Sequence, residues 1–191
     1  MHYALCDYVL DIAQNAVEAG SREVRIEFVE SEEAIDVLVS DDGRGMTAEE
    51  RKRALDPFYS DGTKHARRKV GLGLPFLAQA VAQADGIWSL ESERGRGTKV
   101  SFRFPKGNVD CPPVGDVPGL FLSALCLPGG HEMVVRRVKP APAGGAGGGS
   151  SEYELRRSEL AEAVGGLERA SSLSLIREYL ESQEENIEPG A

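Results

Sequence analysis

The sequence has few cysteines and no long apolar run, and both absences narrow the class of protein. Its 191 residues include three cysteines, which are far apart and form neither a C-x-x-C pair nor a Cys/His cluster. This usage indicates free thiols in a reducing compartment. No segment approaches the ~20 apolar residues that a membrane span requires, and no basic stretch followed by an apolar one opens the chain. We therefore expect a cytoplasmic protein that has no membrane as a partner.

The chain also lacks an excess of positive charge, because its formal net charge is −9 at pH 7. Phosphate groups repel an acidic protein, so we expect no nucleic acid as a partner either. Residues 152–191 contain ten Glu and four Arg, which concentrates the negative charge in the C-terminal part of the chain. Hydrophobic residues make up 41% of the sequence, enough for the core of one domain of ordinary size with an appendage.

Hydrophobic periodicity predicts a domain of mixed helices and strands over residues 1–105. Leu5, Val9 and Ile12 recur at intervals of three or four residues, which is typical of a buried helical face. Thr47 and Glu50 form a T-x-x-E capping box at the start of a short helix. The expected helices lie over 3–19, from Thr47 to about Leu55, and from about Leu74 to Asp85-Gly86, and the expected strands lie around 24–28, 35–39, 87–93 and 99–104.

The rest of the chain divides into three expected segments. They are an extension over 106–139 with a helix over 117–126, capped by Asp116, and a strand over 131–138; a Gly/Pro/Ser linker over 140–151; and an acidic helical tail over 152–191 with helices near 152–164 and 171–186. The linker prediction follows from its composition, PAPAGGAGGGSS. The sequence leaves open whether the two tail helices fold back on the domain or dimerise.

Four short motifs follow one another in the first hundred residues. They are DIAQNAVEAG (11–20), DDGRGM (41–46), VGLGLPF (70–76) and GRGT (95–98). Each is weak alone, since glycine pairs occur in many turns. Together they predict a site for a purine nucleotide, built from a polar helix face, a carboxylate on a glycine turn, a glycine-rich helix start and a late threonine turn.

The first motif places polar residues on one helix face. Asp11 and Asn15 are four residues apart and Glu18 follows three residues later, so the three side chains share a face. A side-chain amide oxygen is a suitable ligand for Mg²⁺, and a carboxylate one turn away can orient or deprotonate an attacking group. The alternative is a merely solvated helix face.

The second motif places Asp41 at the end of an apolar strand. A carboxylate in such a place needs a hydrogen-bond donor, and the exocyclic amine of adenine is one. Gly43 and Gly45 allow a tight turn and the close approach of a flat ring, and Met46 offers a soft apolar wall. The alternative is a simple strand-to-helix turn in which Asp41 or Asp42 caps backbone amides.

The last two motifs fit phosphate and base contacts. Gly71 and Gly73 precede an apolar helix whose N-terminus favours anions, and a basic run lies just upstream. The chain contains no G-x-x-x-x-G-K-[ST] P-loop, and the third glycine of a dinucleotide-binding turn is missing. The hydroxyl of Thr98 could support the adenine contact, directly or through water; the alternatives are a solvated loop and a simple hairpin turn.

In this order, the motifs resemble the ATP-binding domain of the GHKL superfamily, shared by bacterial histidine kinases, anti-sigma-factor kinases, MutL, DNA gyrase B and the Hsp90 chaperones. DIAQNAVEAG is similar to the N box, DDGRGM to the G1 box, DPFYSDG to the F box, VGLGLPF to the G2 box and GRGT to the G3 turn. The resemblance covers about residues 3–105. It implies a Bergerat fold, a two-layer α/β sandwich with helices on one face of a mixed, mostly antiparallel sheet.

The resemblance also implies ATP and Mg²⁺ as cofactors. By position it makes Asn15 the Mg²⁺ ligand, Asp41 the acceptor for the adenine amino group, and Arg68 and Lys69 the residues that approach the phosphates from a lid. The full set implied for cofactor binding is Asn15, Glu18, Asp41, Gly43, Gly45, Met46, Phe58, Arg68, Lys69, Gly71, Leu72, Gly73, Leu74 and Thr98.

Two departures from the family pattern shape the expected function. Only ten residues precede Asp11, too few for the helical hairpin that carries the phospho-accepting histidine of a sensor kinase. Position 11 is Asp, where MutL and gyrase have Glu and typical histidine kinases have Asn; Asp11 is the candidate catalytic residue that orients the acceptor. We expect a Mg-ATP-binding protein of the histidine-kinase type, which transfers the γ-phosphoryl group to a partner protein or hydrolyses ATP slowly as a regulatory module. The alternatives are a nucleotide-sensing module without chemistry and, less favoured, a MutL-like conformational ATPase.

Overall fold

A six-stranded sheet forms the centre of the molecule. The structure, a computed structural model, describes residues 4–56, 73–140 and 150–185. The strands are β1 (Glu23–Glu30), β2 (Ala34–Asp41), β3 (Ile87–Glu93), β4 (Gly97–Pro105), β5 (Glu132–Pro140) and β6 (Ser150–Arg156), in the spatial order β3-β4-β2-β1-β5-β6. Four neighbouring pairs are antiparallel, and β1 and β5 are parallel. The expected mixed, mostly antiparallel sheet is confirmed.

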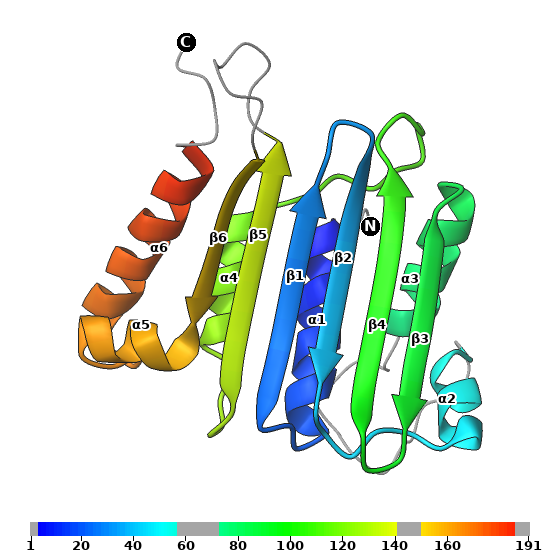
Figure 1. Ribbon diagram of the computed structural model, residues 1–191, viewed down its shortest axis with the longest axis horizontal. Helices are drawn as coiled ribbons and strands as arrows, with labels where there is room; N and C mark the ends of the chain where they lie inside the picture. The colour runs from blue at the N-terminus through cyan, green and yellow to red at the C-terminus, as the bar shows by residue number, and fades with distance from the viewer. Residues whose placement is uncertain (1–3, 57–72, 141–149, 186–191) are drawn as a thin grey trace.

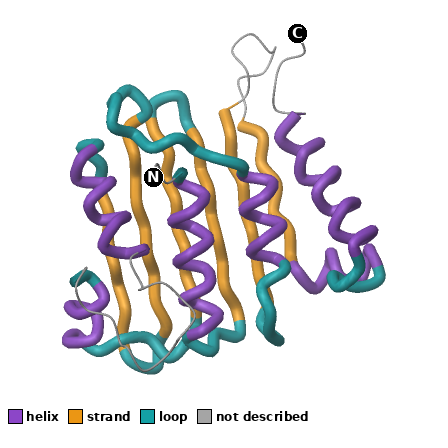
Figure 2. Tube along the Cα trace, turned by 180° about the vertical axis from the view of Figure 1, so that it is seen from behind, coloured by secondary structure: helices purple, strands orange, loops and turns teal. Residues whose placement is uncertain are grey.

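The helices form a second layer on one face of this sheet. They are α1 (Leu5–Glu18), α2 (Ala48–Ala54), α3 (Gly73–Gln83), α4 (Val117–Leu125), α5 (Arg157–Val164) and α6 (Ala170–Glu185). Figure 1 looks onto the open face of the sheet, with α1 and α4 behind the strands, and Figure 2 shows the helices from their own side. The two-layer α/β sandwich is therefore confirmed.

The apolar stripe of α1 holds the two layers together. Leu5, Val9 and Ile12 are at most 5% exposed and lie against the inward residues of the central strands. Burying each such side chain stabilises the fold by roughly 1.5–3 kcal/mol. Because the buried stripe fixes the rotation of α1, its opposite side, which carries Asp11 and Asn15, is turned to solvent.

The predicted helix caps are also confirmed. The hydroxyl of Thr47 accepts a hydrogen bond from the Glu50 amide at 3.2 Å, and the Glu50 carboxylate accepts one from the Thr47 amide at 2.8 Å. The carboxylate of Asp116 accepts a hydrogen bond from the Gly119 amide at 2.9 Å, which caps α4.

The helix predicted from residue 152 is wrong over its first five residues. Residues 150–156 form β6, which pairs antiparallel with β5. The segment alternates, since Tyr153 and Leu155 are buried and Glu154 is exposed on the other face. That period of two is typical of a strand, and the Glu-rich composition concealed it. Pro140 and Ser150, placed in the linker by composition, belong to the paired strands.

The last helix, α6, folds back on the domain, which was one of the two alternatives for the tail helices. Ile176 and Leu180 of α6 are at most 1% exposed and join the core. The guanidinium of Arg137, 1% exposed, pairs with Glu30 and with Glu184 of α6. In the described ranges, no helix is both long enough and apolar enough to cross a bilayer.

Candidate functional site

Several of the described residues that were predicted for nucleotide binding lie near one edge of the sheet. The C-terminal end of α1, the end of β2 and the β3–β4 turn all lie at the lower edge in Figure 1. The strand register brings Asp41 of β2 opposite Thr98 of β4. Motifs that are more than fifty residues apart in the sequence are thus brought together.

The polar face of α1 is present as predicted. Asp11, Asn15 and Glu18 are all exposed, while the apolar positions between them are mostly buried. A Cβ atom added at Gly73 would lie 3.1 Å from Oδ2 of Asp11, so the start of α3 packs closely beside this carboxylate. The Asn15 side chain is exposed and makes no hydrogen bond with the other described residues.

Asp41 differs from an ordinary surface carboxylate. It is half-buried, and its Oδ1 accepts hydrogen bonds from the Gly43 amide at 2.8 Å and from the Ser21 hydroxyl at 3.0 Å. Burial raises the pKa of Asp41 above its usual range, and the stabilising contacts from Gly43, Ser21 and the Thr98 amide only partly offset this. A further donor facing this carboxylate would therefore be stabilising.

The adjacent Asp42 has the structural role that the sequence also allowed. Its carboxylate accepts hydrogen bonds from the backbone amides of Arg22 at 2.7 Å and Glu23 at 3.0 Å. The contact with the Glu23 amide is the main cause that lowers the pKa of Asp42. Both aspartates therefore cap backbone amides, as the alternative for this motif expected, but Asp42 closes the turn between α1 and β1 whereas Asp41 is also held by Ser21 and lies opposite Thr98.

Two glycines bring backbone segments into direct contact. A Cβ atom at Gly45 would lie 2.0 Å from the carbonyl oxygen of Glu93, and one at Gly97 would lie 1.9 Å from the carbonyl oxygen of Asp41. Both residues also have positive φ angles, +59° and +87°. The turn after β2 therefore lies directly on the β3–β4 turn, and the close approach of a ring is not needed to explain Gly45.

The hydroxyl of Ser92 joins these two turns. It accepts a hydrogen bond from the Met46 amide at 2.8 Å and donates one to the carbonyl of Gly97 at 3.0 Å. It also lies 2.9 Å from the hydroxyl oxygen of Thr98. Since the single proton of Ser92 is given to Gly97, Thr98 is the donor of that third bond, and its lone pairs are left to accept from water or a ligand.

Sequence reasoning missed Ser21 and Ser92. Ser92 could have been found, because the predicted hairpin places it opposite Thr98 in the register of β3 and β4. Ser21 could not, because its contact with Asp41 joins residues twenty positions apart through the meeting of a helix end and a strand end.

The remaining residues predicted for nucleotide binding lie beside the group around Asp41, in the core, or outside the described residues. Met46 is half-exposed beside Ser92, and Leu74 packs against the core from the first turn of α3. Phe58, Arg68, Lys69, Gly71 and Leu72 lie outside the described residues. In the part of the chain that is described, no three His, Cys, Asp or Glu side chains are grouped as metal ligands.

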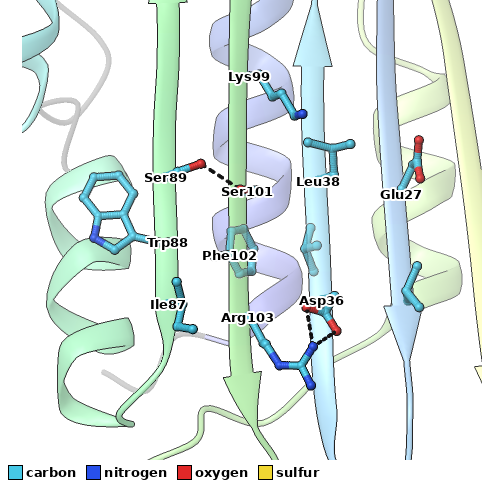
Figure 3. Close-up of a pocket in the computed structure, with 12 residues that line it drawn as sticks. Glu27, Asp36, Leu38, Ile87, Trp88, Ser89, Lys99, Ser101, Phe102 and Arg103 are labelled. Atoms are coloured by element: carbon cyan, nitrogen blue, oxygen red, sulfur yellow. Dashed lines mark hydrogen bonds and ion pairs between the residues drawn. The ribbon is translucent and has the colours of Figure 1, made fainter.

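A separate cavity of about 480 Å³ lies on the open face of the sheet. Figure 3 shows its lining, including Leu38, Ile87 and Lys99, with α1 behind the strands. Asp36 and Arg103 in this lining pair with each other at 3.0 Å. The cavity shares no residue with the group around Asp41, so it is a different feature of the molecule.

Comparison with known proteins gives one family. The model of the histidine kinase-, DNA gyrase B-, and HSP90-like ATPase family matches residues 3–108. The sensor histidine kinase RcsC of Salmonella typhimurium is 34% identical over 88 residues, which is 45% of this chain and 9% of RcsC. The sensor histidine kinase ZraS of Klebsiella oxytoca is 35% identical over 103 residues, 51% of this chain and 21% of ZraS.

These relatives are much longer than the matched region. This chain covers between 9% and 21% of the length of such curated proteins. Among solved structures, the mycobacterial sensor histidine kinase MprB aligns with a TM-score of 0.39 and 22% identity, over 51% of this chain and 67% of that one.

Proposed function

This chain belongs to the family of histidine kinase-, DNA gyrase B-, and HSP90-like ATPases, and from this membership we propose that it binds Mg-ATP and transfers the γ-phosphoryl group to a partner protein, or hydrolyses ATP slowly as a regulatory module. The observation that carries the proposal is the half-buried carboxylate of Asp41, linked through Ser21 to the helical turn that bears Asn15. A base-recognition group and a metal ligand are thereby held in one unit.

Asp41 recognises the base in this proposal. Its carboxylate accepts a hydrogen bond from the exocyclic amine of adenine. This additional donor stabilises the charged carboxylate against the cost of its partial burial. The hydroxyl of Thr98, opposite in the strand register, accepts from the same base or from a bridging water. A purine with a carbonyl in place of the amine would present an acceptor to Asp41 and would be disfavoured.

Asn15 and Asp11 act at the phosphate end. Bound Mg²⁺ neutralises phosphate charge and holds the phosphates in position, and the amide oxygen of Asn15 fits the hard oxygen ligands that this ion prefers. Asp11 lies one turn away, beside the start of α3, where it would orient the acceptor group or a water. Arg68, Lys69 and the amides near Gly71 are proposed phosphate contacts from the family pattern alone.

Calorimetric titration with Mg-ATP tests the binding proposal. Asp41→Asn should weaken binding by about 10- to 100-fold, because it removes a charged acceptor and places an amide before the amine. Asn15→Ala should weaken Mg-ATP more than metal-free ATP. The matched controls are Asp36→Asn on the opposite face of β2 and Gln14→Ala on α1, and both should bind as the wild type does. Equal affinity of Asp41→Asn and Asp36→Asn would contradict the proposed base contact.

Turnover with γ-labelled ATP separates the catalytic proposal from the sensing module. A kinase or ATPase should release or transfer label, and Asp11→Asn should slow that step while leaving nucleotide affinity within about twofold. Tight binding without label on any protein and without released phosphate would instead favour the module that senses nucleotide without chemistry.

A further inference from the structure

We infer that Ser21 is a positioning residue for base recognition: its hydroxyl fixes the carboxylate of Asp41 so that it meets the exocyclic amine of the purine. This inference rests on the proposed function. The hydroxyl lies 3.0 Å from Oδ1 of Asp41 and 2.6 Å from the carbonyl oxygen of Ala16. Ser21 itself is 8% exposed, so water competes little for these contacts.

The local backbone brings this hydroxyl back over the last turn of α1. Gly20 has a φ of +80°, which ends the helix and reverses the direction of the chain before β1 begins. The side chain of Ser21 thereby reaches Ala16, the residue next to Asn15. The hydroxyl thus joins the end of α1 to the end of β2, two elements with no hydrogen-bond ladder between them.

Gly43 allows this junction to form. A Cβ atom there would lie 2.6 Å from Oγ of Ser21 and 2.8 Å from Oδ1 of Asp41. The Gly43 amide donates to the same Oδ1 at 2.8 Å. Two donors therefore converge on one carboxylate oxygen. They restrict the rotation of the carboxylate, which the Thr98 amide also faces, and its remaining acceptor capacity is left to a further donor.

The hydroxyl has one proton and two acceptors. Ala16 O and an ionised Asp41 both require it, so the two contacts share the proton. Ser21 also satisfies a carbonyl at the end of α1, a capping role that stabilises the helix whatever the ligand. The experiment must therefore separate lost stability from lost selectivity for the amine.

Affinities for Mg-ATP and Mg-ITP make this separation, because inosine carries a carbonyl where adenine carries the amine. Ser21→Ala should weaken Mg-ATP by about five- to tenfold and change Mg-ITP by less than about twofold. The loss of Mg-ATP affinity in Ser21→Ala should grow as the pH is lowered. Removing a donor raises the pKa of Asp41 further, so more of the carboxylate is protonated and can no longer accept from the amine. Ser21→Thr keeps the hydroxyl and should restore selectivity. Ser40→Ala, on the other face of β2, is the matched control and should change neither affinity.

A double-mutant cycle with Asp41→Asn completes the test. Ser21→Ala should have no further effect on Mg-ATP affinity once Asp41 is replaced, since it acts through that carboxylate. If Asp41→Asn abolishes selectivity but Ser21→Ala retains it, the inference is overturned and the proposed function stands. If the wild type does not distinguish the two nucleotides, the proposed contact of Asp41 with the base and this inference both fail, whereas binding of Mg-ATP is judged by the titration itself. If Ser21→Ala does not fold, Ser21→Cys, of similar size and with a weak donor, should show the same selective loss.

Discussion

Replacement of Arg137 should separate the stability of the fold from nucleotide binding. The guanidinium is 1% exposed, pairs with Glu30 and Glu184, and lies 4.8 Å from the centre of the Phe28 ring. Arg137→Met keeps most of the side-chain volume but removes the charge, so that both carboxylates lose their buried partner. Removing one member of a buried ion pair destabilises proteins by about 3–5 kcal/mol.

The neighbouring cations place the expected loss at the lower end of this range. Lys106 lies 2.8 Å from Glu30 and Lys139 lies 3.6 Å from Glu184, so each carboxylate keeps one cationic partner. We therefore expect the free energy of unfolding in urea to fall by about 3 kcal/mol. Adding Glu184→Gln to Arg137→Met should recover part of this loss, because one of the two carboxylates that lost the guanidinium is then neutral.

Nucleotide binding by the folded variant should be unchanged. In the strand register Arg137 lies beside Phe28 and Asp41 beside Val24, so the two residues lie toward opposite ends of β1. Calorimetry at a temperature where the variant is fully folded checks this. A loss of stability below about 1 kcal/mol, or a weakened Mg-ATP affinity with unchanged stability, would refute the reasoning.

Two further predictions concern the backbone junction and a buried histidine. Gly97→Ala should destabilise the protein and weaken Mg-ATP, because its Cβ would meet the Asp41 carbonyl at 1.9 Å, whereas Gly95→Ala has a similar φ but open space and should cost only about 1 kcal/mol in thermal or urea unfolding. His131 is buried and both of its ring nitrogens lack a partner among the described residues; burial, together with the charge of Arg157, lowers its pKa. The unfolded chain therefore binds the proton first as the pH falls below about 6.5, and stability should decline by up to about 1.4 kcal/mol per pH unit. His131→Leu should remove that part of the pH dependence in urea titrations at several pH values, and an identical slope in the variant would exclude this explanation.

Much of the fold could be predicted from local patterns, because those patterns report on burial. The apolar stripe of α1 and the alternation in β1 and β2 each determine an element, and the caps at Thr47 and Asp116 determine two helix starts. The pattern failed at β6, where charged residues on the open sheet face resembled a solvated helix. Sequence composition cannot show that β5 would pair in parallel with β1, because that contact depends on the whole layer of helices.

The candidate site likewise has features that the sequence predicts and features that it does not. The shared face of Asp11, Asn15 and Glu18 follows from helical spacing, and the structure has it. The contacts of Ser21 and Ser92 depend on how close separate turns approach, and spacing along the chain does not encode such distances. The contrast between Asp41 and Asp42 likewise emerges only when their hydrogen-bond partners are known.

A crystal structure with a non-hydrolysable ATP analogue and Mg²⁺ tests the central claim most directly. The account predicts that a carboxylate oxygen of Asp41 lies about 2.7–3.2 Å from the exocyclic nitrogen of adenine, with the amide oxygen of Asn15 on the metal. Adenine bound elsewhere, or turned with another edge toward Asp41, would contradict it.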